Sequence, residues 1–372
     1  MLLLGLRSVV LISVLVDVPD FQSAASERYR VIAEAVGRPY RDFEVEYAPG
    51  EIAIAEAVGS GTSASARRLL ALIAFSGDIT AFGAIRRGWG ADAARRYLWL
   101  GLPLLIFIYR RADLVTVALA VTALMLARRH REGAGGLAMT AAFLTRLWPV
   151  ILTPIWAIER NLRALWVFAA AASAGVIAWA AYGGPDGIGQ VSSFRGATGW
   201  ELESSVGVVV WAITDEHRFE AGANRTGIVP GWAGPAMLVI LIALFALIWL
   251  RARHPGSEPA GPAALAAVAA LLIVSPLLSP QYVSWLLPWA AIAGVGRRFT
   301  TVAAVPIVLT GAIVTGWSLD LGLGAGPDQT ILFLRNCSLV AIVVTYFVWT
   351  RPDRPAVRAR HGSAAPTPRP AR

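Results

Sequence analysis

The sequence predicts an all-α, polytopic membrane protein. Of its 372 residues, 56% are hydrophobic and only 15% are charged, and the mean hydropathy is +0.59. This composition is typical of a chain that crosses a membrane many times, and it excludes an ordinary soluble domain. Apolar runs alternate with short arginine-bearing loops along residues 1–350. We therefore expect one domain of about 11–13 transmembrane or re-entrant helices there.

The apolar runs delimit the expected membrane segments. They cover residues 2–18, 69–85, 97–109, 114–127, 137–158, 165–182, 232–250, 263–277, 282–295, 302–317 and 331–349. Several are shorter than the roughly 20 residues that a straight helical crossing needs. Short pieces are tolerated at membrane depth where other protein segments cover their backbone. We expect such a pair of half-helices to meet around residues 109–113.

The first apolar run has two interpretations. It could be a secretory signal peptide with a cleavage site near residues 22–25. However, no basic cluster precedes it, and many further spans follow. We favour an uncleaved first transmembrane helix.

The orientation in the membrane follows from arginine, because the chain contains no lysine. Short loops rich in basic residues stay in the cytoplasm. Such loops cover residues 86–96, 128–131, 160–163, 251–253 and 297–298. Two large external loops, 17–68 and 183–231, should then face outward. The tail 351–372, rich in Arg and Pro, is expected to be disordered, cytoplasmic and close to anionic lipid.

One segment conflicts with simple alternation. The loops at 128–131 and 160–163 both carry the arginine that predicts a cytoplasmic position. The apolar run between them, 137–158, cannot then be a single crossing. We expect it to be re-entrant or to form two short passes, with a break near Arg146 and Pro149.

The first external loop concentrates charge next to the membrane. Residues 37–50 place Arg38 just before Tyr40, and Arg41, Asp42, Glu44 and Glu46 between Tyr40 and Tyr47. Residues 26–36 are expected to form a short amphipathic helix, with Ser26 as its N-cap and with Tyr29, Ile32, Ala33 and Val36 on one face. Most of these carboxylates are expected to be solvated. A partly buried one becomes more basic, which suits it to accept a proton from a hydroxyl nucleophile.

Several stretches resemble one family of membrane enzymes. Pro39-Tyr-Arg-Asp-Phe43, followed by Glu46-Tyr-Ala-Pro49, resembles the PYRDF…EYPP stretch of the GT-C glycosyltransferases of the DUF2029 group, glycosyltransferase family 87. That family includes polyprenyl-phosphate-mannose-dependent α-mannosyltransferases. Four further stretches are similar to family segments and keep their order along the chain. They are Thr145-Arg-Leu-Trp-Pro149, Trp200-Glu-Leu-Glu-Ser204, Ser279-Pro-Gln-Tyr-Val-Ser-Trp-Leu-Leu-Pro288 and Leu334-Arg-Asn336.

The resemblance implies a catalytic carboxylate in the first external loop. Related sequences often read D-V-x-R-Y just before the PYRDF stretch, and that aspartate is the expected base. Here Ala25 stands at the corresponding position. Either Asp20 takes the role, with Asp17 and then Asp42 as further candidates, or the base is missing.

The resemblance also implies residues that bind substrate. The matched stretches contribute Tyr40, Arg41, Glu46, Tyr47, Arg146, Glu203, Gln281, Tyr282 and Arg335.

Several of these residues also have a structural interpretation. Arg146 lies in an apolar run, where a charge needs a partner. A donor phosphate would serve, and so would an internal ion pair, for example with Asp78. Arg335 could bind phosphate or anchor its helix at the membrane interface. Gln281 could bind sugar or phosphate, or satisfy carbonyl groups that neighbouring prolines release.

The expected function is that of an inverting hexosyltransferase of the cell membrane. It would move a hexose, with mannose favoured, from a polyprenyl-phosphate donor to a lipid or glycan acceptor on the extracytoplasmic face. The expected partners are these substrates and membrane lipids, without nucleic acid. Arginine can stabilise a monophosphate leaving group, so neither a metal nor a cofactor is expected. The alternatives are a lipid or sugar flippase and a non-catalytic relative with the same fold.

Overall fold

The computed structural model describes residues 2–16, 24–184, 186–193, 199–220, 223–227, 229–254, 258–294, 298–319 and 329–350. In these ranges the protein is all-α, apart from one antiparallel pair of three-residue strands. The predicted fold class is therefore confirmed. The carboxylates Asp17 and Asp20 and the tail 351–372 lie outside the described residues.

The elements follow one another along the chain with few long connections. They are α1 (Leu2–Val16), α2 (Ala24–Glu34), α3 (Pro49–Gly59), α4 (Ser63–Trp89), α5 (Ala91–Leu100), η1 (Leu102–Leu104), α6 (Leu105–Ile108), α7 (Asp113–Arg128), α8 (Glu132–Thr145), η2 (Trp148–Leu152), α9 (Pro154–Ile158), α10 (Leu162–Gly183), α11 (Asp186–Ser193), α12 (Ser205–Thr214), β1 (Arg218–Glu220), β2 (Ala223–Arg225), α13 (Ala233–Ala252), η3 (Pro259–Ala263), α14 (Ala264–Val274), η4 (Pro280–Leu286), α15 (Leu287–Ile292), α16 (Arg298–Leu319) and α17 (Gln329–Trp349).

Five helices of the described chain are long and apolar enough to cross a membrane: α4, α10, α13, α16 and α17. Apolar helices of 10–17 residues, such as α1 and α12, add shorter segments. Leu238, Val239 and Ile242 of α13 remain exposed, as do Trp166 and Ile177 of α10. Apolar surface of this kind would cause aggregation in water, whereas lipid accommodates it. The outer helices therefore present membrane-facing surfaces.

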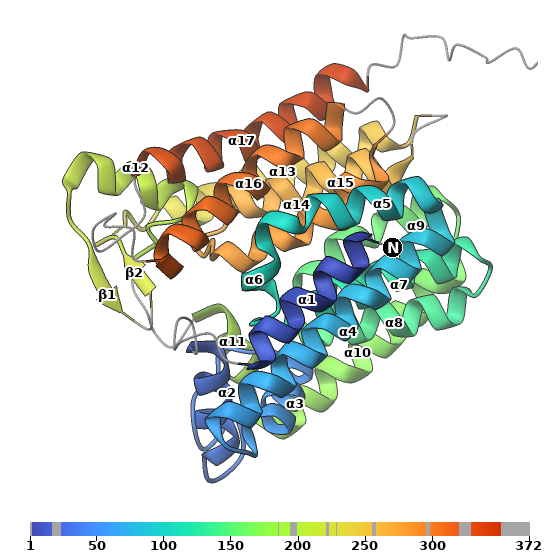
Figure 1. The fold of residues 1–372 in the computed structure, drawn as a ribbon. Helices are drawn as coiled ribbons and strands as arrows, with labels where there is room; N and C mark the ends of the chain where they lie inside the picture. The colour runs from blue at the N-terminus through green and yellow to red at the C-terminus, as the bar shows by residue number, and fades with distance from the viewer. Residues whose placement is uncertain are drawn as a thin grey trace, which may run out of the picture.

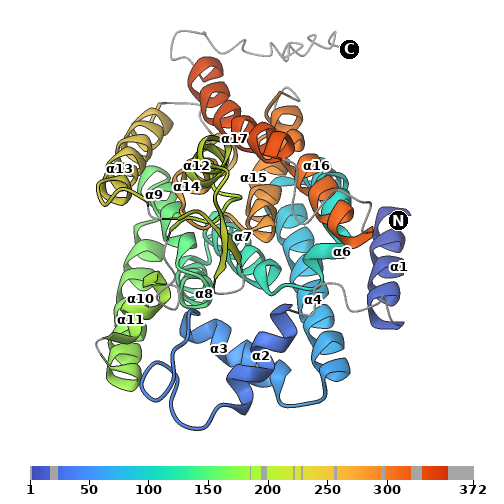
Figure 2. The ribbon, with the colours of Figure 1, turned by 90° about the vertical axis from the view of Figure 1, so that its left-hand side faces the viewer.

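The two halves of the chain form two adjoining bundles (Figure 1). In the N-terminal half, α4, α7, α8 and α10 pack side by side in that order. In the C-terminal half, α17 packs against both α14 and α16, and α13 packs against α14. Figure 2 shows the same division from one end, with α2 and α3 beneath the N-terminal bundle. Contacts of α15 with α5 and of η4 with α7 join the halves around one core.

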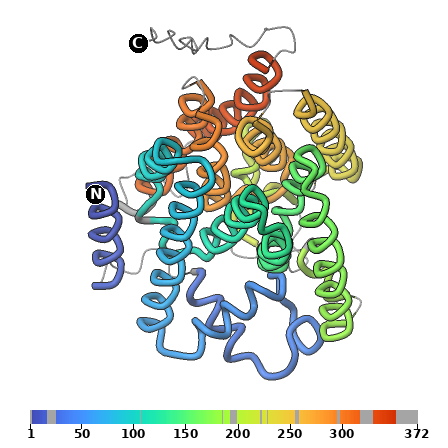
Figure 3. Tube along the Cα trace, turned by 90° about the vertical axis from the view of Figure 1, so that its right-hand side faces the viewer, coloured from blue at the N-terminus to red at the C-terminus, as the bar shows by residue number. Residues whose placement is uncertain are grey.

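The edges of the assembly differ in how much protein covers them. Figure 3, viewed from the other end, shows the dark blue α1 at one side and the green α10 and gold α13 at the opposite side. The central helices α7 and α14 are mostly buried. Gly77 of α4 permits a close contact with α7, because a Cβ there would lie 2.8 Å from the carbonyl oxygen of Leu114. Glycine thus lets two central helices approach backbone to backbone.

Arginine-bearing helix ends gather at one end of the bundle. Trp89 at the end of α4 and Arg128 at the end of α7 both donate to Oε1 of Glu258, at 3.2 and 2.7 Å. Arg251 at the end of α13 donates to Thr350, just beyond α17, at 2.7 Å. We call this the arginine-rich end. The opposite end, where α4 and α7 begin and where α2 and α3 lie, is called the loop end.

The chain reverses at Arg146, as the sequence predicts. Helix α8 ends at Thr145, and Arg146 adopts an extended conformation before the short helices η2 and α9. Next to α9, Glu159 lies close to charges of the arginine-rich end: burial and Glu258 raise the pKa of its carboxyl, and Arg128 lowers it. The run 137–158 therefore forms two short helical legs, and the turn between them lies at the loop end.

A buried ion pair fastens α1 to the N-terminal bundle. The guanidinium of Arg7 contacts the carboxylate of Asp78 in α4, and both side chains are almost completely buried. The hydroxyl groups of Tyr97 and Tyr109 each donate a 2.7 Å hydrogen bond to the same carboxylate. Asp78 is thus committed to Arg7, and the suggestion that it pairs with Arg146 is wrong.

Helix α2 differs in detail from its prediction. It already includes Ala24, so Ser26 lies inside the helix and does not cap it. Tyr29 and Ile32 face the protein as expected, but Val36 lies beyond the helix and is 94% exposed. The helix stops early because Gly37, with φ of 108°, adopts a conformation open to glycine and costly for other residues.

Candidate functional site

The PYRDF stretch forms a tight turn that docks on the protein. Tyr40 takes a left-handed φ of 69°, and its hydroxyl donates to the carbonyl oxygen of Tyr47 at 2.5 Å. Its ring lies 5.4 Å from that of Trp179 in α10. Gln190 of α11 binds the same turn from the other side: it donates to the carbonyl oxygen of Tyr40 at 2.7 Å and accepts from the Val45 amide at 3.1 Å. Tyr40 therefore anchors the loop.

The polar residues of this turn have structural partners. Asp42 is exposed and accepts a 2.6 Å hydrogen bond from the Arg38 amide, which closes the turn. Arg41 is also exposed. The carboxylate of Glu46 is buried and receives two hydrogen bonds from Arg28 of α2, at 2.9 and 2.6 Å. These contacts place Asp42, Arg41 and Glu46 outside the cluster described next.

Helix α3 delivers a carboxylate that sequence reasoning did not select. Pro49 begins the helix, a position where its missing amide hydrogen costs nothing. A Cβ on Gly50 would lie 2.8 Å from Oγ1 of Thr145 and 2.9 Å from the carbonyl oxygen of Leu144. Glycine therefore lets α3 approach the end of α8. The next residue, Glu51, is 1% exposed and faces Arg146.

Arg146 lies between two buried carboxylates. Its Nη2 is 2.8 Å from Oε1 of Glu51 and 3.5 Å from Oδ2 of Asp113, the first residue of α7. The side chains of Glu51 and Asp113 are only 1% and 2% exposed, whereas that of Arg146 is 16% exposed. The guanidinium thus covers the two carboxylates and retains some exposed surface. We call these three residues the acidic–arginine cluster.

The two oxygens of Glu51 have different surroundings. Oε1 accepts both the Arg146 hydrogen bond and a 2.7 Å hydrogen bond from the hydroxyl of Tyr29 in α2. Oε2 is equally buried and has no partner among the described residues. Burial raises the pKa of Glu51 to about 7, and Asp113 adds to the rise against the opposing effects of Arg146 and Tyr29. The carboxyl is therefore divided between its charged and neutral forms near neutral pH.

Two predicted tyrosines flank the guanidinium of Arg146. Its Cζ lies 5.7 Å from the ring centroid of Tyr47 and 5.9 Å from that of Tyr282. Both hydrogen bonds described for Arg146 use Nη2. Within the described residues Nε has no partner, and Nη1 has no hydrogen bond. The structure therefore brings Tyr47, Arg146 and Tyr282 together and leaves donors unused.

Aromatic side chains continue from this point into the core. The rings of Tyr282 and Trp285 are 4.4 Å apart, and Trp285 stacks on Trp148 at 4.9 Å. Nε1 of Trp285 donates to Oδ1 of Asp113 at 2.9 Å. Both oxygens of Asp113 thus have partners. Gln281, which directly precedes Tyr282 in the chain, is partly exposed and accepts a 2.7 Å hydrogen bond from Ser279.

Arg335 has a structural partner in the second large loop. It is fully buried in α17, and its Nη1 lies 2.9 Å from Oε2 of Glu203. Its Nη2 donates to the carbonyl oxygen of Glu203, which also accepts from Asn336 at 3.1 Å. Arg335 therefore clamps the segment 200–204 to α17. Burial raises the pKa of the neighbouring Glu201 to about 7, with Glu203 as the next contribution.

Arg111 is a second residue of this region that the sequence analysis did not select. It precedes α7 by two residues and is partly exposed. Its guanidinium lies 5.3 Å from the ring centroid of Phe107 and has no hydrogen bond or ion pair among the described residues. Its charge is among those that lower the pKa of Tyr47 and of Glu203, although burial, the largest effect, raises both. Arg111 therefore lies near both large loops. The Arg-Arg-Ala-Asp sequence at 110–113 could have signalled Arg111 and Asp113, because charges between apolar runs mark functional positions.

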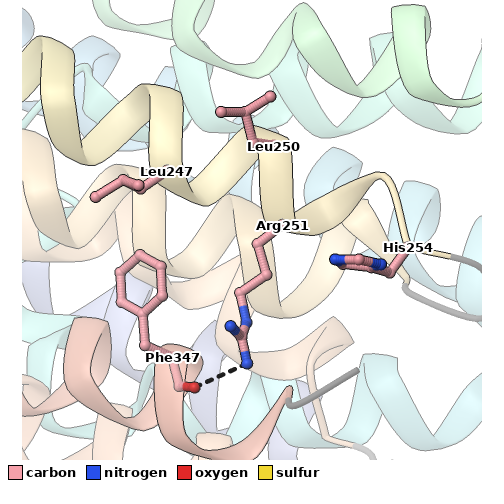
Figure 4. Close-up of a pocket in the computed structure, with 5 residues that line it drawn as sticks. All are labelled: Leu247, Leu250, Arg251, His254 and Phe347. Atoms are coloured by element: carbon pink, nitrogen blue, oxygen red, sulfur yellow. Dashed lines mark hydrogen bonds between the residues drawn. The ribbon is translucent and has the colours of Figure 1, made fainter. Parts of the chain in front are cut away.

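A surface pocket elsewhere lacks comparable chemistry. Figure 4 shows the side chains that line it between α13 and α17, at the arginine-rich end: Leu247, Leu250, Arg251, His254 and Phe347. Nη2 of Arg251 donates to the carbonyl oxygen of Phe347 at 2.9 Å, which ties the two helices together. The residues described contain no group of three His, Cys, Asp or Glu side chains that could hold a metal ion.

No family model and no curated protein matches the chain.

Proposed function

We propose that the protein is an inverting hexosyltransferase that uses a polyprenyl-phosphate sugar, with mannose favoured, on the extracytoplasmic face of the cell membrane. The observation that carries the proposal is the arrangement of Arg146. It is a partly exposed guanidinium at the loop end, held by two carboxylates and two tyrosine rings, with Nε and Nη1 unused.

An anionic ligand suits this arrangement. A phosphate accepts hydrogen bonds from several guanidinium nitrogens at once, and such charge-assisted bonds are the stronger ones. Asp113 keeps Arg146 oriented through Nη2, so Nη1 can meet a ligand without losing that contact, whereas Nε is buried. Arg111, close to Tyr47, offers a second guanidinium without a hydrogen bond. Two such cations could hold the departing phosphate without a metal ion.

The surroundings also suit a sugar attached to a lipid. Tyr47 and Tyr282 present ring faces beside the guanidinium, and sugars pack on aromatic rings through their C–H faces. The exposed apolar faces of the long helices suit contact with lipid, and a polyprenyl chain dissolves in the same lipid.

The test is sugar transfer by the full-length protein in membrane vesicles. Radiolabelled polyprenyl-phosphate mannose is supplied with a lipid extract as acceptor, and labelled glycolipid is measured. Arg111→Gln should raise KM for the donor about 10-fold or more, because a charge-assisted hydrogen bond contributes about 1.5–3 kcal/mol. Arg95→Gln is the control, because Arg95 pairs with Asp92 at an exposed position on the α5 surface.

Two results would contradict the proposal. One is a folded wild-type protein that transfers no hexose from any polyprenyl phosphate. The other is movement of a fluorescent donor lipid across proteoliposome membranes without transfer, which would instead indicate a flippase. Unchanged KM in Arg111→Gln would remove Arg111 from the phosphate site.

A further inference from the structure

We propose that Glu51 accepts the proton of the attacking acceptor hydroxyl, an inference that rests on the glycosyltransferase function proposed above. In the step, the hydroxyl oxygen bonds to the anomeric carbon, and the bond between that carbon and the phosphate oxygen breaks. The electron pair leaves with the polyprenyl phosphate. The hydroxyl proton passes to Oε2 of Glu51 and later to water.

The first argument is the asymmetry of the Glu51 carboxyl group. Two donors, Tyr29 and Arg146, fix Oε1 at 2.7 and 2.8 Å. Oε2 is buried without a partner among the described residues. Leaving a buried polar atom unsatisfied costs about 1–3 kcal/mol, and native proteins rarely do so without a functional reason. The side chain is thus held in one orientation, with one lone-pair-bearing oxygen kept free.

The second argument is that the other buried carboxylates near the cluster, Glu46 and Asp113, have partners for both oxygens, whereas Asp42 is exposed and lies outside the cluster. Both oxygens of Glu46 receive hydrogen bonds from Arg28. Those of Asp113 face Trp285 and Arg146. Asp42 closes an exposed turn through the Arg38 amide. Glu51 is therefore the carboxylate of this group whose geometry permits a proton to be accepted.

The third argument is the proton affinity of Glu51. The charged and titratable groups that face it are Tyr29 from α2, Arg146 from the end of α8, Asp113 from α7, Tyr282 from η4, and Tyr40, Glu46 and Tyr47 from the preceding loop. Burial outweighs Arg146, so the pKa is about 7. A base with a pKa near the working pH combines a populated anion with useful basicity.

Asp113 completes the arrangement. When Glu51 takes up a proton, it loses its charge, and Arg146 would be left without a counterion. Asp113 stays within 3.5 Å of Nη2 and is itself held by Trp285. Arg146 therefore remains oriented toward the phosphate in both protonation states of Glu51. Asp113 and Tyr29 act as positioning residues and do not contact the reacting atoms.

The experiment compares Glu51→Gln with Glu56→Gln, which lies in the same helix but is exposed. Glutamine keeps the shape of the side chain and removes its basicity. We expect Glu51→Gln to lower kcat about 100-fold or more, the usual contribution of a general base, with the donor KM within threefold of wild type. Glu56→Gln should have the kcat and the donor KM of the wild-type protein. Glu51→Asp should recover part of the activity.

Tyr29→Phe supplies a second test if Glu51→Gln fails to fold. It removes one donor from Oε1, and that hydrogen bond lowers the pKa of Glu51. The acidic limb of the pH–kcat profile should therefore move to higher pH. If the wild-type protein transfers hexose but Glu51→Gln keeps the same kcat, the role of Glu51 is overturned and the proposed function stands. An unchanged pH–kcat profile in Tyr29→Phe has the same meaning. A folded wild-type protein without any transfer overturns the proposed function as well.

Discussion

Arg7 of α1 and Asp78 of α4 form an ion pair that is almost completely buried, with side-chain exposures of 0% and 1%. Tyr97 and Tyr109 complete the coordination of the Asp78 carboxylate. This network is the principal polar link between the first helix and the rest of the described bundle. It shows how the protein can keep a charge inside an apolar helix.

Breaking this pair should destabilise the protein strongly. Arg7→Ala leaves Asp78 buried without its counterion, which typically costs about 3–5 kcal/mol. We expect a clear fall in the melting temperature of the protein in detergent, measured by intrinsic fluorescence. Arg95→Ala breaks the exposed pair with Asp92 and should leave that temperature unchanged. Equal melting temperatures for the two variants would show that the Arg7 pair contributes little.

The stability of the protein should fall as the pH rises from about 4.5 to about 7. The carboxyl groups of Glu51 and Glu201 have pKa values of about 7 in the folded state, against an ordinary glutamate value of 4.5 that applies when the chain is unfolded. In that window the folded state holds protons that the unfolded state has released, so higher pH favours unfolding. Each group contributes a slope of at most about 1.4 kcal/mol per pH unit.

Two variants check the origin of this slope. Glu51→Gln and Glu201→Gln should each flatten the decrease of the unfolding free energy between these pH values, because neither glutamine titrates. Glu56→Gln, at an exposed position, should keep the wild-type slope. Chemical unfolding in detergent at several pH values gives the measurement. Stability that increases with pH in all four proteins would contradict the raised pKa values.

Gly50→Ala should weaken the contact between α3 and α8. The new Cβ would lie 2.8 and 2.9 Å from atoms of Thr145 and Leu144, one of them a backbone oxygen. Such overpacking costs about 1–3 kcal/mol, which exceeds the 0.5–1 kcal/mol that alanine gains over glycine in a helix. The melting temperature should therefore decrease. Gly133→Ala in α8 is the control, because nothing lies within 4 Å of the new Cβ. Its melting temperature should equal or exceed that of the wild-type protein.

Arg335→Gln should release the segment 200–204 from α17. The variant loses the ion pair with Glu203 and the hydrogen bond to its carbonyl oxygen. We expect faster amide hydrogen exchange in that segment, measured by mass spectrometry, while exchange in α4 stays the same. Cys337→Ser, at an exposed position two residues further along α17, should not change exchange in the segment. Slow exchange in Arg335→Gln would mean that other contacts hold the loop.

Some of the candidate site could be predicted from the sequence. Arg146 in an apolar run required a partner, and the matched stretches selected Tyr47 and Tyr282, which lie on either side of it. Of the suggested partners, Asp78 was wrong: it belongs to Arg7, and Arg146 forms its internal ion pairs with Glu51 and Asp113. A charged residue in an apolar run reveals that it needs a counterion, but the run does not reveal which one.

The sequence by itself determined the all-α membrane class, the arginine-bearing helix ends and the reversal of the chain at Arg146. These features depend on local hydropathy and local charge, which are properties of each segment alone. Only the tertiary structure decided that Glu51 faces Arg146, 95 residues away in the chain. That pairing depends on how closely α3 packs against α8 at Gly50, and close packing between distant segments has no local signature.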